Sequence, residues 1–155
     1  MKPHGKALRK GRFSQQGGIY LLSFTAYLRH PWFTDWVSGR LVVAALRRSQ
    51  ELGGVESLAY VVMPDHVHWL VGLGHARLDE LMRNVKSHSG FHVKQRIKQK
   101  GGAVPKAVWQ AGYHDRALRR EESLREVAHY IVLNPVRAGL VKSIRDYPLW
   151  DAIWL

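Results

Sequence analysis

The sequence predicts an α+β fold of the ferredoxin-like type, an antiparallel sheet with helices on one face. Strand-like and helix-like segments follow in the order strand, helix, strand, strand, helix, strand, which is the order of that fold. A Pro-Asp pair between the two middle strands indicates a hairpin. A further capped helix comes after this core and is an addition to it.

The first strand and the first helix have clear boundaries. A glycine pair opens an apolar segment, rich in strand-forming residues, that runs from Gly17 to about Tyr27. Helical periodicity follows over residues 35–54, with Asp35 as the N-cap and a glycine pair as the stop signal.

The hairpin is centred on the sequence YVVMPDHVHWLVGL. Residues 56–63 form the second strand, and residues 66–73 return as the third after the turn at Pro64 and Asp65.

The second half of the chain supplies a long helix, a short strand and the capped helix. Apolar residues in helical spacing predict a helix over residues 78–98, and residues 107–118 are typical of a short strand with an irregular tail. Ser123 and Glu126 form a capping box ahead of an apolar stripe. Pro135 ends this helix, because the residue before a proline avoids the helical conformation.

Length, charge and cysteine content limit the classes of function that this chain can have. A chain of 155 residues favours one domain, here residues 17–155 behind a flexible basic arm of residues 1–16. The formal net charge of +12 favours a nucleic-acid partner over a membrane, because no amphipathic anchor helix stands out. The absence of cysteine excludes disulfides, thiolate metal sites and cysteine nucleophiles, and it suits a cytoplasmic protein.

Two histidines are expected on one face of the third strand. Because side chains alternate across a strand, His66 and His68 share a face while Val67, Trp69 and Val71 take the other. Two imidazoles on one face can share a single cation. The pattern therefore fits a metal site, and it fits equally well two histidines that face solvent or form hydrogen bonds.

Tyr130 is a candidate nucleophile. It borders the apolar stripe of the capped helix, and Asn134, four residues later, shares its face. A nearby cation would polarise the group that the tyrosine attacks and would favour the phenolate. The alternative is a boundary tyrosine whose hydroxyl forms a hydrogen bond.

Three segments together resemble the HUH single-tyrosine transposases. They are MPDHVHWLV, VWQAGYHDRALR and HYIVLNPVRAGLV, and the likeness runs from about Gly17 to Trp150. It is greatest with the branch associated with repetitive extragenic palindromes (REP), the REP-associated tyrosine transposases. That family has the ferredoxin-like HUH endonuclease core, and its nucleophilic tyrosine lies on a helix.

The resemblance implies an endonuclease and strand transferase that acts on single-stranded DNA at palindromic hairpins. His66 and His68 would bind Mg²⁺ or Mn²⁺, with Asn134 as the third ligand. Tyr130 would attack the scissile phosphate and leave a 5′-phosphotyrosine link and a 3′-hydroxyl. We expect a bacterial, cytoplasmic, nucleoid-associated protein, and we favour a monomer over a homodimer.

Other residues could supply the same chemistry. Tyr113 is a rival nucleophile in an extended segment, and His114 and Asp115 are rival ligands. His88 and His92, four residues apart on the long helix, could bind metal, but a polar face in contact with DNA backbone or solvent fits them better.

Proteins that bind single strands combine a basic groove with aromatic side chains on which bases stack. The basic candidates lie on the arm, on the long helix and before the last helix: Arg9, Lys10, Arg12, Lys86, Lys94, Arg96, Arg116, Arg119 and Arg120. The candidate stacking residues are Trp32, Trp36, Trp109 and Trp150.

Two other functions stay open from the sequence. A hairpin-binding protein that keeps the fold without cleaving DNA would form no covalent adduct. A hydrolase that uses metal-bound water would keep its activity in the variant Tyr130→Phe.

Overall fold

The computed structural model describes residues 18–119 and 123–154. Its centre is an antiparallel five-stranded sheet in the order β4-β1-β3-β2-β5. The strands are β1 (Gly18–Thr25), β2 (Val55–Met63), β3 (His66–Leu73), β4 (His114–Ala117) and β5 (Trp150–Ala152). The first four have the ferredoxin-like order, which confirms the predicted fold class, and β5 extends the sheet beyond β2.

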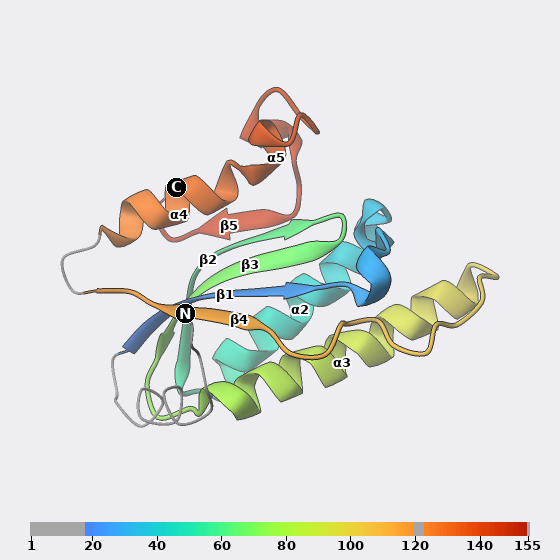
Figure 1. Cartoon of the computed structure of the whole chain (residues 1–155), viewed down its shortest axis with the longest axis horizontal. Coiled ribbons are helices and arrows are strands. Elements are labelled where there is room, and N and C mark those ends of the chain that lie inside the picture. Colours follow the sequence, from blue (N-terminus) through green and yellow to red (C-terminus); the bar gives the residue numbers. More distant parts are fainter. Residues whose placement is uncertain (1–17, 120–122, 155) are drawn as a thin grey trace.

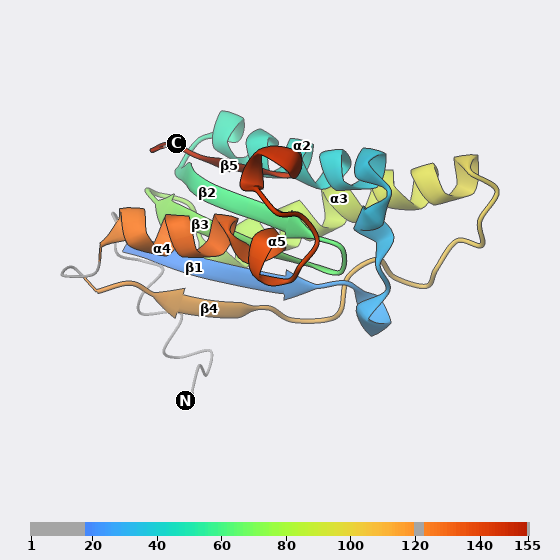
Figure 2. The same ribbon diagram turned by 90° about the horizontal axis from the view of Figure 1, so that it is seen from above.

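Helices cover both faces of the sheet (Figures 1 and 2). Helices α2 (Trp36–Leu52) and α3 (Leu78–Gln99) lie on one face, whereas α4 (Leu124–Val132) and the short α5 (Asn134–Arg137) lie on the other. Strand β2 is buried along most of its length because both α2 and α4 pack against it. Within the described ranges, no helix combines the length and apolar character that a membrane crossing would need.

Short 3₁₀ turns connect these elements. Two of them, η1 (Tyr27–Arg29) and η2 (Trp32–Thr34), follow β1, and η3 (Ile144–Asp146) lies near the end of the chain. The first strand ends earlier than predicted, because Leu28 and Arg29 adopt positive φ angles of 55° and 56° that turn the chain out of the sheet.

Two other predicted elements differ from the structure. In residues 107–118 the strand occupies the second half, as β4, and the first half is irregular apart from a bridge between Ala26 and Trp109. Strand β5 was not predicted, because its three residues are too few to show an alternating pattern.

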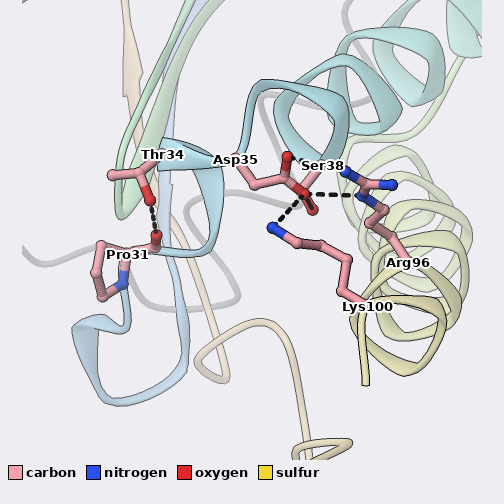
Figure 3. Close-up of polar contacts among 6 residues, drawn as sticks. All are labelled: Pro31, Thr34, Asp35, Ser38, Arg96 and Lys100. Atoms are coloured by element: carbon pink, nitrogen blue, oxygen red, sulfur yellow. Dashed lines mark hydrogen bonds and ion pairs between the residues drawn. The ribbon is translucent and has the colours of Figure 1, made fainter. Parts of the chain in front are cut away.

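Asp35 occupies the predicted N-cap position of α2, but its carboxylate binds other side chains (Figure 3). It accepts hydrogen bonds from Nε and Nη2 of Arg96 at 2.9 and 3.3 Å, and from Ser38 Oγ at 3.0 Å. The hydrogen bond from Arg96 is the main reason that the pKa of Asp35 is lowered to about 2. The contact joins the start of α2 to the end of α3.

Candidate active site

His66 and His68 lie at the start of β3, on the face of the sheet that α4 and α5 cover. The predicted alternation holds, because Val67, between the two histidines, and Trp69, directly after them, are fully buried on the opposite face. The two imidazole centroids are 4.9 Å apart and the rings are nearly perpendicular, at 84°. Rings at this spacing lie within reach of one common ion, given metal–nitrogen bonds of about 2 Å.

Asp65 orients the first of these histidines. Its Oδ1 accepts a hydrogen bond from Nδ1 of His66 at 2.7 Å, which leaves the Nε2 lone pair for a metal ion. Asp65 is held in turn by Arg29, whose Nε lies 3.1 Å from Oδ2, and by the backbone N–H of Ala26, which donates to its carbonyl at 2.8 Å. The sequence predicts Asp65 only as a turn residue. Its position directly before His66 was the available signal.

His68 is held in the neutral form. Burial is the main cause, and the charges of His66 and Arg137 add to it, so that the pKa falls from 6.5 to about 4. At neutral pH the ring therefore keeps the lone pair that metal coordination requires.

Tyr130 lies near the end of α4 and points away from the core. Its side chain is 64% exposed, whereas Ala128 and Ile131 on the same helix are buried. The predicted capping box starts the helix, since Ser123 Oγ accepts a hydrogen bond from the backbone N–H of Glu126 at 3.2 Å. The amphipathic pattern of α4 therefore buries one side and leaves the tyrosine hydroxyl accessible.

Arg137 joins the tyrosine to the other candidate residues. Its Nη2 donates to Asn134 Oδ1 at 2.9 Å and to the backbone carbonyl of Tyr130 at 2.6 Å, and its Cζ lies 3.9 Å from the centroid of the Tyr130 ring. Its charge also acts on His68, which places it near β3. Arg137 lies within the motif HYIVLNPVRAGLV, but the sequence alone predicts no role for it. Its spacing, three residues after Asn134 and seven after Tyr130, was the available signal.

The donor set fits a divalent cation. Imidazole nitrogen and amide oxygen are donor types that such an ion accepts, and three protein ligands would leave coordination positions open for phosphate and water. Among the described residues, no three histidine, aspartate or glutamate side chains are grouped so that they could hold a metal ion. Asn134 as the third ligand stays a prediction.

The rival tyrosines are engaged elsewhere. Tyr113 donates its hydroxyl to Asp79 Oδ1 at 2.8 Å. Tyr147 donates to the carbonyl of Val62 at 2.5 Å, and burial raises its pKa to about 12. Tyr60 is buried too, and burial is the main cause of its raised pKa. A nucleophile needs an accessible hydroxyl, and among these four tyrosines Tyr130 offers it best.

The rival ligands do not join the pair on β3. His114 lies on the same sheet row as His68, through Ser23, but it is two strands away, roughly 10 Å at the usual strand spacing. Asp115, the next residue along β4, is buried. His88 and His92 lie together on α3, which covers the opposite face of the sheet.

The predicted basic DNA contacts are spread over several elements. Arg9, Lys10, Arg12 and Arg120 lie outside the described residues, as does the arm of residues 1–16. Lys86 and Lys94 donate to the backbone carbonyls of Gln110 and Lys106, at 2.8 and 3.1 Å, and Arg96 pairs with Asp35. Arg116 and Arg119 are exposed at and after β4. Contact with DNA stays a prediction for all of these residues.

Trp109 belongs to the core. It is 7% exposed, it packs against Phe24 and Phe33, and its Nε1 donates to Ser89 Oγ at 2.9 Å. A base finds no open ring face there, so the expected stacking role does not fit the structure. Trp32 and Trp150 also use their indole N–H groups on backbone carbonyls, whereas Trp36 is 51% exposed.

Comparison with known proteins identifies the family and the fold. The family described as "Transposase IS200 like" matches residues 15–134. A REP-associated tyrosine transposase of Escherichia coli is 32% identical over 143 residues, which cover 88% of this chain and 78% of the relative. The solved structure of a REP-associated tyrosine transposase bound to a REP hairpin has the same fold, with a TM-score of 0.70 and 22% identity over 97% of this chain and 82% of that one. The chain therefore belongs to the IS200-like transposase family and, within it, to the REP-associated tyrosine transposases.

Proposed function

We propose that this protein is a metal-dependent endonuclease and strand transferase that acts on single-stranded DNA at REP-like hairpins in the bacterial cytoplasm. The observation that carries the proposal is the group around Arg137, which contacts the exposed Tyr130 and Asn134 and whose charge helps to lower the pKa of His68 in the pair on β3. A hairpin partner is supported by the solved structure of the relative, which is bound to a REP hairpin.

His66, His68 and Asn134 would hold Mg²⁺ or Mn²⁺, which offsets negative charge on the scissile phosphate and orients it. The Tyr130 oxygen, having lost its proton, forms a bond to phosphorus while the bond from phosphorus to the 3′ oxygen breaks. That oxygen leaves with a proton as a 3′-hydroxyl, and the phosphate stays on the tyrosine as a 5′-phosphotyrosine. Attack by another 3′-hydroxyl reverses the step and joins strands without an external energy source.

The test is adduct formation. The protein is incubated with end-labelled single-stranded DNA that carries a palindromic hairpin from its own genome, with Mn²⁺ or with EDTA, and the products are separated on a denaturing gel. We expect a Mn²⁺-dependent protein–DNA adduct that disappears in Tyr130→Phe and persists in Tyr113→Phe. Cleavage that survives in Tyr130→Phe would indicate a water nucleophile, and tight binding without an adduct would indicate a binding protein.

A further inference from the structure

Among the residues that the structure describes, Arg137 is the one cation that contacts both the candidate nucleophile and the candidate amide ligand. Within the described residues, it forms no ion pair with a carboxylate, whereas Arg96, Arg29 and Arg77 each do. Its partners are a neutral carbonyl, a neutral amide and an aromatic face. Its positive charge is therefore not neutralised by those neighbours.

One role of Arg137 is local and structural. The carbonyl of Tyr130 lies in the last turn of α4, where carbonyl groups lack helical partners, and the guanidinium supplies a donor there. This role needs little more than a single N–H group at Nη2. An arginine carries five donors in a planar fork, and the fork matches the geometry of a phosphate.

The position of the guanidinium is more specific than capping requires. It stacks over the Tyr130 ring at 3.9 Å, so an anion that approaches the tyrosine also meets the cation. Its Nη2 also donates a hydrogen bond to Asn134 Oδ1, the atom expected to face the metal ion. A phosphate attacked by Tyr130, next to an ion held by Asn134, would thus lie beside the guanidinium.

We infer that Arg137 binds a non-bridging oxygen of the scissile phosphodiester and stabilises the charge that develops there during attack. This inference rests on the proposed function, because it assigns a second cation to the same reaction. Removing one such preorganised donor from a reacting centre typically slows the chemical step on the order of 100-fold to 1,000-fold.

The experiment compares Arg137→Ala with the full-length wild type on two oligonucleotides. One carries the normal phosphodiester at the cleavage position, and the other a methylphosphonate, in which a methyl group replaces a charged oxygen. Single-turnover rates of strand cleavage are measured with Mn²⁺. Arg125→Ala, which removes an exposed arginine from the neighbouring helix α4, controls for loss of general attraction to DNA. Arg137→Lys tests whether charge without the planar fork restores part of the rate.

We expect Arg137→Ala to cleave the phosphodiester about 100-fold more slowly than wild type, with a much smaller difference on the neutral methylphosphonate. Arg137→Lys should fall between the two proteins, and Arg125→Ala should resemble wild type. An equal loss on both substrates would overturn the inference, because a purely structural arginine does not sense phosphate charge. No adduct from wild type on the phosphodiester would overturn the proposed function as well, so the two failures are distinguishable.

Discussion

Two pairs of histidines in this molecule have nearly the same internal geometry. The ring centroids of His66 and His68 are 4.9 Å apart at 84°, and those of His88 and His92 are 4.6 Å apart at 64°. The first pair arises from the two-residue period of a strand and the second from the four-residue spacing of a helix. Ring spacing alone would make both pairs metal sites.

Their surroundings separate them. On β3, the Asp65 carboxylate orients one ring, and the charge of Arg137 acts on the other. On α3, burial is the main cause of the lowered pKa of His88, and Arg48 and His92 add to it. Within the described residues, neither ring of the α3 pair is bonded to a carboxylate. The carboxylate bonded to His66 therefore distinguishes the pair on β3 from the pair on α3.

The largest effect should come from the ligands themselves. We expect His68→Ala to reduce the rate of adduct formation at least about 100-fold, beyond the losses typical of residues that only support a ligand. His88→Ala should leave the rate within about twofold of wild type, because α3 covers the other face of the sheet. Single-turnover gels with Mn²⁺ measure both rates. Equal losses in the two variants would break the distinction between the pairs.

Asp65→Asn should weaken Mn²⁺ binding by about 10-fold to 100-fold, because the amide no longer fixes the tautomer and orientation of His66. Isothermal titration measures the affinity. Arg29→Ala is the matched control, since it removes the ion pair of Asp65 while leaving the bond to His66 in place. If Arg29→Ala lowers the affinity as much as Asp65→Asn does, the carboxylate acts through the turn and not through the histidine.

His68 should also make stability depend on pH when metal is removed with EDTA. Its pKa of about 4 in the folded chain lies below the ordinary value of 6.5, so the unfolded chain takes up the proton first as the pH falls. Stability is thus greatest above pH 6.5 and declines towards pH 4, with a loss of about 2 kcal/mol between pH 7 and 5. Urea unfolding of His68→Gln should show a decline smaller by that amount. Parallel pH curves for variant and wild type would rule out a neutral buried His68.

The smallest effect should come from Arg96 on α3, which covers the face of the sheet opposite the histidine pair on β3. Arg96→Ala should slightly lower the free energy of unfolding at pH 7 and leave adduct formation unchanged, because its partner is Asp35. The Asp35 pKa is lowered, so this contribution is present above pH 3.8 and is lost as the pH falls towards 2. Chemical denaturation at pH 7 and pH 3 measures it. A loss of activity without a loss of stability would instead place Arg96 on DNA.

The ferredoxin-like core was predictable because its signals are local. The turn at Pro64 and Asp65, the alternation around Val67 and the capping box at Ser123 each depend on neighbours within a few residues. The placement of Trp109 depends on Phe24 and Phe33, which are distant in the sequence, and no local pattern shows it. The same holds for Asp35, whose partner Arg96 lies 61 residues away.

The candidate site was predictable in part. His66 and His68 follow from strand period, and Tyr130 and Asn134 were placed together by helical spacing and by resemblance. The bond from His66 to Asp65 and the position of Arg137 over the tyrosine ring are side-chain choices among several rotamers, which the sequence leaves open.

The most direct test of the distinction between the two pairs is a Mn²⁺ titration followed by electron paramagnetic resonance, in which bound ions lose the sharp signal of the free ion. Wild type, His66→Ala/His68→Ala and His88→Ala/His92→Ala would be titrated side by side. We expect wild type and the α3 variant to take up a single Mn²⁺ with the same affinity, and the β3 variant to take up none at that affinity. Uptake that survives in the β3 variant, or is lost in the α3 variant, would contradict the assignment of the metal centre to His66 and His68.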